Sequence, residues 1–240
     1  LRAYQFQERK EDNWIFIQCM FEQLRMEKPA AVHKACSASP DEIRKMVNLS
    51  VDLLHSGTVS GAREASLYGV PSIASSIAKH DPNIDPTDAV EITVDLAERL
   101  LKIIPTPLPN LRRPHKSASA IQWDGEDSTI VQMFSNGDIF LNLNIPENTS
   151  RKIVAASVGA RWYAGACNII QEDEETYLRV GSLSITDDQI DGVSSEVLRN
   201  GDSSLTCLAA WPQLHPLNVG DAALKQANIP SVSGLPRWIT

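Results

Sequence analysis

The sequence has few cysteines, and they lie far apart. Cys19, Cys36, Cys167 and Cys207 form no C-x-x-C pair and no cluster with histidine in the 240 residues. This spacing excludes the disulfide scaffold that is typical of small secreted proteins. We therefore expect reduced thiols and a cytoplasmic location, because isolated cysteines stay reduced in that compartment.

Long apolar runs and an excess of basic residues are also missing. No stretch of about 18 uncharged apolar residues occurs, so we expect no transmembrane helix and no membrane partner. The net charge is −8 and no basic stripe is present, so nucleic acid is not an expected partner. A free nucleotide remains compatible, because it needs only a local anion site. The first residues, Leu1–Tyr4, lack a signal-peptide pattern and an initiator Met, which fits a start partway through a longer product.

The composition that is present, 42% hydrophobic and 22% charged residues, is that of a globular protein. The middle of the chain predicts helices over 60–68 and 85–104 and strands over 70–75 and 138–146, with Gly69 as the end of the first helix. Alternating strands and helices are typical of an α/β layer protein. On the second helix we expect one buried face made of Val90, Val94, Ala97, Leu100, Leu101 and Ile104.

The pattern changes after about residue 150. Residues 1–150 are expected to form an α/β core, of which 1–40 are atypical. Short apolar runs separated by acidic turns predict a β-rich extension with long hairpins over 151–222. Residues 223–240 are expected to form a tail with a short helix and a loose end.

The most informative segment, Asn48–Glu64, reads as a loop that enters a helix. Ser56 and Thr58 supply hydroxyl groups, and Gly57 lets the backbone approach a ligand closely. The unpaired N–H groups and the dipole of a helix start favour an anion such as phosphate. A competing interpretation is that Ser56 or Thr58 only caps the helix.

This segment resembles the SurE family of metal-dependent nucleoside monophosphate phosphatases. The family block Asn-Leu-Gly-Asp-Asp-x-x-Tyr/His-Ser-Gly-Thr-Val is followed by a Gly-Ile-Pro-Ser-Ile-Ala segment, which residues 69–76 match. Residues 141–146 and 201–208 look like two later strands of the family, so the resemblance covers about residues 48–208. The positions that match the block are Asn48, Asp52, His55, Ser56, Gly57, Thr58, Val59, Ala62 and Glu64.

The resemblance implies a three-layer, Rossmann-like α/β core, truncated or altered at the N-terminus, with a β-rich C-terminal hairpin extension. It implies that Asn48, Ser56, Gly57 and Thr58 face a bound phosphate. The implied substrate is a nucleoside 5′- or 3′-monophosphate or another phosphate monoester, and the implied cofactor is a divalent metal, Mg or Mn. Homo-dimers or homo-tetramers built from exchanged hairpins are also implied.

The metal site of the family is the part that this sequence does not match. The family uses an Asp-Asp-Gly turn near the N-terminus, and residues 1–47 contain none. Arg44 stands where the family has a metal-binding Asn, and a guanidinium cannot ligate a cation. Asn48 is then the only metal candidate. Asp187 and Asp188 imitate a metal turn, but we interpret them as solvated loop residues.

Other residues leave two interpretations open. His55, next to Ser56, is interpreted as a packing residue rather than half of a catalytic pair, and no catalytic residue is assigned. The basic run 112–116 is a solvated loop or lies near a nucleotide, and 161–163 is a half-buried strand edge or a base-stacking surface.

Two functions are expected from the resemblance and its gaps. The chain is a SurE-like phosphatase that is impaired, or it is an inactive or truncated homologue that binds anions or assembles with partners. A purely structural oligomer module is the third hypothesis.

Overall fold

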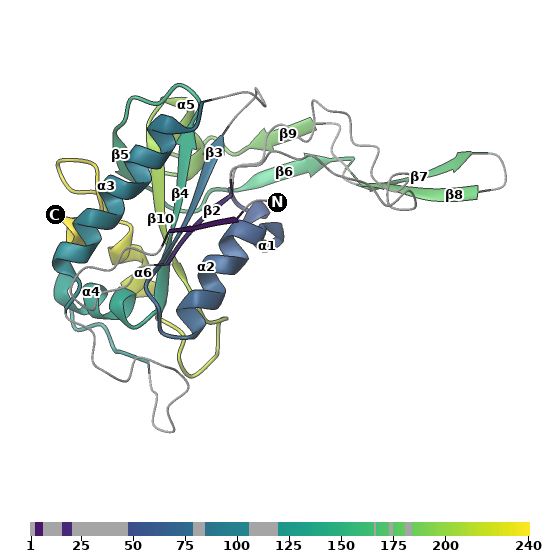
Figure 1. Ribbon diagram of the computed structural model, residues 1–240. Helices are drawn as coiled ribbons and strands as arrows, with labels where there is room; N and C mark the ends of the chain where they lie inside the picture. Colours follow the sequence, from purple (N-terminus) through teal and green to yellow (C-terminus); the bar gives the residue numbers. More distant parts are fainter. Residues whose placement is uncertain are drawn as a thin grey trace.

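The computed structural model describes residues 3–6, 16–20, 48–78, 85–105, 120–165, 167–172, 175–180 and 184–240. Within these ranges a six-stranded sheet lies between helices, and a β-stranded arm projects from one side (Figure 1). None of the described helices is long and apolar enough to cross a bilayer.

The sheet has the strand order β1-β2-β3-β4-β10-β5. Strands β2, β3 and β4 are parallel neighbours, whereas β1 is antiparallel to β2 and β10 is antiparallel to β4. The last strand, β5, runs parallel to β10. The strands are β1 (Ala3–Phe6), β2 (Phe16–Met20), β3 (Ser72–Ala78), β4 (Ile139–Pro146), β5 (Ile153–Ala155) and β10 (Ser203–Ala209).

Both faces of the sheet are covered by helices, which gives three layers. On one face, the odd-numbered residues of β4 share a core with α3, α4, α6 and η1. On the other face, Phe140 of β4 packs with Val59 and Ala62 of α2. The α/β class is therefore confirmed. The helices are α1 (Asp52–His55), α2 (Gly57–Leu67), α3 (Thr87–Ile103), α4 (Asp127–Ser135), α5 (Ser194–Arg199), α6 (Asp221–Ala227) and η1 (Arg237–Ile239).

The helix predicted over 85–104 is present as α3, but its buried face differs from the predicted one. Val94 is 36% exposed, and the neighbouring Thr93 is buried instead. The Thr93 hydroxyl lies 2.7 Å from the carbonyl oxygen of Ala89 and 2.8 Å from Ser75 Oγ on β3, so its polar group is satisfied inside. This pairing turns the helix so that the buried residues are Ala89, Ile92, Thr93, Leu96, Ala97 and Leu100.

Two glycines hold α2 in its place. Gly69 follows the helix with a φ of +79° and donates its N–H to the carbonyl of Ser66, which confirms it as the predicted end of the helix. Gly137 leads from α4 into β4 with a φ of +72°, and a Cβ there would lie 2.3 Å from the carbonyl oxygen of Ser66. The connection before β4 therefore passes so close to the end of α2 that no side chain fits between them.

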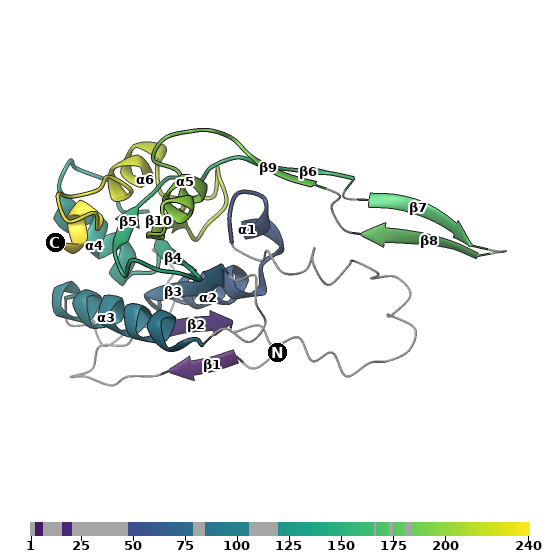
Figure 2. The same cartoon turned by 90° about the horizontal axis from the view of Figure 1, so that it is seen from above.

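The arm is built from two antiparallel strand pairs (Figure 2). β6 (Arg161–Ala164) pairs with β9 (Ser184–Asp187), and β7 (Cys167–Glu172) pairs with β8 (Glu175–Val180). The extension expected over 151–222 is larger than this arm, because β5 and β10 from that range belong to the main sheet. Their apolar residues, such as Leu205, are buried in the core and cannot project with the arm.

The C-terminal residues belong to the core as well and do not form a loose end. Trp238 is 4% exposed, and its ring lies 5.5 Å from that of Phe134 on α4. The indole Nε1 donates to the carbonyl oxygen of Ala227 at 3.0 Å. The short apolar tail thus closes the layer of helices that covers β4 and β10.

Candidate functional site

Ser56 forms the start of helix α2. Its Oγ accepts the backbone N–H of Val59 at 3.1 Å, so the capping interpretation holds for this residue. A capping hydroxyl satisfies one of the N–H groups that a helix start leaves open, and the earlier groups of the first turn have no acceptor within the helix. These belong to Gly57, which is exposed, and to Thr58, which is 1% exposed. An anion at this helix start would meet the N–H of the exposed Gly57 beside the hydroxyl group of Ser56.

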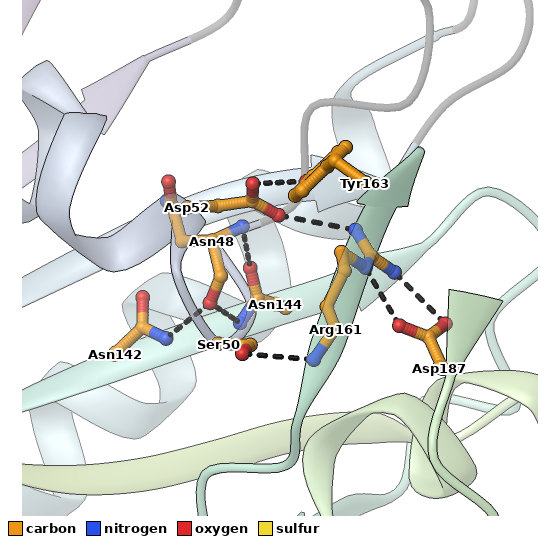
Figure 3. A network of polar contacts seen from close by, with 8 residues as sticks. All are labelled: Asn48, Ser50, Asp52, Asn142, Asn144, Arg161, Tyr163 and Asp187. Atoms are coloured by element: carbon orange, nitrogen blue, oxygen red, sulfur yellow. Dashed lines mark hydrogen bonds and ion pairs between the residues drawn. The ribbon is translucent and has the colours of Figure 1, made fainter. Parts of the chain in front are cut away.

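Asn48, the first residue of the same segment, is held by two asparagines of β4 (Figure 3). Its N–H donates to Asn144 Oδ1 at 3.0 Å, and its carbonyl oxygen accepts from Asn142 Nδ2 at 3.0 Å and Asn144 Nδ2 at 3.2 Å. The side-chain Nδ2 of Asn48 donates to Ser76 Oγ on β3. Polar side chains of β4 thus fix the backbone of Asn48 at the sheet, and Ser76 of β3 holds its side chain.

Asn142 is left with a buried oxygen to pair. The residue is 1% exposed, and its Oδ1 accepts no hydrogen bond within the described ranges. An unpaired buried acceptor costs about 1–3 kcal/mol, so such a group marks a place where a donor is needed. Because the Nδ2 of the same amide holds Asn48, this acceptor lies beside the candidate segment.

A second set of contacts ties this segment to the arm (Figure 3). The Arg161 guanidinium donates from Nε and Nη2 to the two oxygens of Asp187, at 2.6 and 3.0 Å, and from Nη1 to Asp52 at 3.1 Å. The other oxygen of Asp52 accepts the hydroxyl of Tyr163. The backbone N–H of Arg161 donates to Ser50 Oγ at 2.9 Å. Two neighbouring positions on one face of β6 thus bind the loop around Asp52.

Burial and ion pairing together shift the pKa values of these three groups. Burial raises the pKa of Asp52, although Tyr163 and Arg161 both stabilise the carboxylate. Burial, together with the Asp52 carboxylate, raises the pKa of Tyr163 to about 12. The pKa of Arg161 is also raised, because the contacts to Asp187 and Asp52 outweigh the burial of its charge. The guanidinium is 7% exposed and stays charged, so its two carboxylates are its natural counter-ions.

The described residues do not fit a site for a divalent cation. Within the described ranges, no three residues among His, Cys, Asp and Glu come together as a metal-binding group. Asp52 and Asp187 are paired with Arg161, and Asp188 accepts from the indole of Trp162 at 3.2 Å. The interpretation of Asp187 as a solvated loop residue is wrong, because it is the last residue of β9 and its half-buried carboxylate pairs with Arg161. Arg44, at the position of the family's metal-binding Asn, lies outside the described residues.

The remaining candidates divide into described and undescribed residues. The side chain of His55 and the basic run 112–116 lie outside the described part of the structure. In the segment 161–163, Trp162 is 63% exposed, while Arg161 is buried. The role of Arg161 in holding Asp52 was not predicted from the sequence. The signal that could have indicated it is the alternation of inward and outward side chains in a short strand.

These observations define a class of protein. It is an α/β protein in which a polar loop, held at the sheet through Asn48, enters a serine-capped helix. The family model described as "Survival protein SurE" matches residues 43–165, just over half of the chain. The chain therefore belongs to the SurE family.

Curated relatives agree with this assignment. The chain is 25% identical over 185 residues to the 5′-nucleotidase SurE of Geotalea daltonii. This match covers 74% of this chain and 62% of that protein. It is 30% identical over 164 residues to the 5′-nucleotidase SurE of Sorangium cellulosum, which covers 68% of this chain and 52% of that protein. The chain thus spans about half to two thirds of the length of these relatives.

A solved structure also matches. The crystal structure of the SurE protein from Aquifex aeolicus is 22% identical and has a TM-score of 0.46. The match covers 71% of this chain and 58% of that one.

Proposed function

We propose that this chain binds phosphate monoesters, with nucleoside 5′- or 3′-monophosphates as the principal ligands, at the start of helix α2. The observation that carries the proposal is the Ser56-capped helix start in a loop whose first residue, Asn48, is fixed by Asn142 and Asn144. Open N–H groups and the helix dipole attract an anion, and the hydroxyl groups of Ser56 and Thr58 add further hydrogen-bonding groups. The names of the relatives, 5′-nucleotidases, support the same ligand class.

The binding proposal is tested by titrating the purified chain with inorganic phosphate and with AMP. We expect saturable shifts of the backbone amide signals of Gly57 and Thr58. Shifts that appear elsewhere while Gly57 and Thr58 stay unchanged would refute the assignment. For variants of Ser56, the matched control is Ser60→Ala, since Ser60 is exposed on α2 and does not cap the helix.

Hydrolysis is the family activity, and we propose that this chain performs it weakly or not at all. A divalent cation, Mg or Mn by resemblance, supplies charge neutralisation and an activated water in metal-dependent phosphatases. The described residues do not provide carboxylates for such an ion, because Asp52 is committed to Arg161 and Tyr163. In this proposal the residues of the loop bind and orient the phosphate, and the chain acts as an anion-binding homologue.

Release of phosphate from AMP by the purified chain, with and without Mn²⁺, decides between the two functions. We expect no Mn²⁺-stimulated turnover above background. Robust turnover that EDTA abolishes would show an active phosphatase, with ligands drawn from residues such as Asp41 that lie outside the described ranges.

We also propose that the chain forms homo-dimers or homo-tetramers through the arm and that it acts in the cytoplasm. Exposed apolar side chains on the arm, such as Ile169 at 78% and Trp162 at 63%, support self-association, because strand edges with apolar residues favour pairing. Light scattering at micromolar concentration is the measurement. A monomeric mass would count against this proposal, and Ile169→Lys is expected to lower the mass of any oligomer.

A further inference from the structure

The base of the arm and the proposed phosphate loop are joined through the two oxygens of Asp52. One oxygen accepts from Arg161 and the other from Tyr163, and both donors belong to β6. Asp52 lies four positions before Ser56 in the sequence, in the short helix α1 that precedes the capped start of α2. Strand β6 therefore contacts the chain only four residues before the capped start of α2.

Ser50 adds a contact that does not depend on charge. Its Oγ accepts the backbone N–H of Arg161, and its own backbone has a φ of +49°. A residue other than glycine, asparagine or aspartate rarely adopts this left-handed conformation. The family block has glycine here, but glycine has no hydroxyl group. Ser50 therefore adopts a strained backbone conformation, and its hydroxyl oxygen binds the backbone N–H of Arg161 in the arm.

Each of the three nitrogens of the Arg161 guanidinium already donates to a protein carboxylate. Its Nε and Nη2 face Asp187, and its Nη1 faces Asp52, and the group is 7% exposed. Such charge-assisted and bidentate contacts fix the geometry of the groups that the arginine holds.

We infer that Arg161, with Tyr163, is a positioning residue that holds the loop from Asn48 to Ser56 in its anion-binding geometry and couples that geometry to the arm. This inference rests on the proposed phosphate site, and it adds the arm as a determinant of that site. Phosphate binding and the order of the first turn of α2 should therefore both depend on contacts made by β6.

The test compares Tyr163→Phe and Arg161→Met with two matched controls. Tyr163→Phe removes one hydroxyl and changes no charge at neutral pH, so an effect on binding cannot come from a lost charge. Tyr68→Phe is its control, because Tyr68 is 57% exposed at the end of α2. Arg151→Met is the control for Arg161→Met, because Arg151 also pairs with two carboxylates, Asp88 and Glu91, but on the surface.

Two readouts are taken at a temperature far below unfolding. The first is the Kd for inorganic phosphate, which we expect to rise by about tenfold in Tyr163→Phe and in Arg161→Met, as happens when residues that orient a binding group are removed. The second is amide hydrogen exchange in the ligand-free protein. We expect faster exchange at Val59 and Ser60, with unchanged exchange at Leu143 in the centre of β4, whereas the controls leave both readouts unchanged.

The outcomes separate this inference from the proposed function. If the wild-type chain binds no phosphate, the proposed function fails, and the exchange at Val59 still decides whether Arg161 and Tyr163 position the loop. If phosphate binds but Tyr163→Phe changes neither the Kd nor the exchange at Val59, the inference is overturned. A rise in exchange that is equal at Val59 and Leu143 shows general destabilisation and also overturns it. Should Arg161→Met fail to fold, Tyr163→Phe and Arg161→Lys decide, and lysine is expected to restore only part of the binding because it cannot bridge both carboxylates.

Discussion

Substitutions of Ser56 separate the stability of helix α2 from the binding of an anion. Ser56→Ala removes the acceptor for the Val59 N–H and is expected to cost about 1 kcal/mol of unfolding free energy. In a chain of this size that loss lowers the Tm by about 2–4 °C. Ser56→Asn and Ser56→Asp keep a capping oxygen, because both residues cap helices about as well as serine.

The two capping variants have the same shape and differ in charge. At an effective dielectric constant of about 20, a carboxylate about 4 Å from a phosphate is repelled by about 4 kcal/mol per unit of charge. This corresponds to a loss of close to a thousandfold in affinity. We therefore expect Ser56→Asp to remain folded with a near-normal Tm and to lose phosphate binding, while Ser56→Asn keeps part of the binding.

Thermal unfolding followed by calorimetry gives the stability of each variant, and amide shifts during a phosphate titration give the Kd. Equal affinities of Ser56→Asp and Ser56→Asn would refute the placement of the phosphate at this helix start. An unchanged Tm in Ser56→Ala would refute the argument that the cap stabilises α2.

Two further predictions concern the core. Trp238→Ala removes a buried indole together with its ring contact to Phe134 and is expected to cost about 3–5 kcal/mol in urea unfolding, and a loss below about 1 kcal/mol would contradict the packed tail. The second concerns the buried thiol of Cys207, whose pKa burial raises from 9.0 to about 12. Because the unfolded thiol ionises first, the stability that it contributes is complete below pH 9 and is lost between about pH 9 and 12, by up to about 1.4 kcal/mol per pH unit. Urea unfolding of the wild type and of Cys207→Ala across this range measures the difference, and parallel pH profiles would contradict the burial of the thiol.

The features that the sequence predicted well are local. Gly69 ends α2 because a left-handed residue is needed directly after the helix, and glycine adopts that conformation without strain. The alternation of residues 139–146 predicted β4, since a strand turns successive side chains to opposite faces. The serine cap was an explicit alternative and is present, because it depends on residues only three positions apart.

The contacts that define the site are not local, and the sequence did not predict them. Asn142 and Asn144 bind the backbone of Asn48 from 94 and 96 residues away, and Arg161 meets Asp52 across 109 residues. No periodicity relates residues at such distances, because their contact follows from the order of the strands in the sheet. The prediction of the buried face of α3 was wrong for a related reason. Thr93 faces inward and forms a hydrogen bond with Ser75, which lies on β3.

Strand β4 shows how one register serves both the core and the site. Leu141 and Leu143 point into the core beneath α3 and α4, while Asn142 and Asn144 point to the other face and hold Asn48. A shift of one residue would turn the asparagines into the apolar layer, so the register is fixed by the burial of the leucines. The hydrophobic core thereby places the amide groups that fix the start of the loop.

The loop thus has a support on each side of Ser50. The core reaches it at Asn48 through β4, and the arm reaches it at Asp52 through Arg161 and Tyr163. Since Ser56 follows directly after α1, both supports act on the start of α2. A loop fixed from two sides loses less conformational freedom when an anion binds, because most of its order is already present before binding.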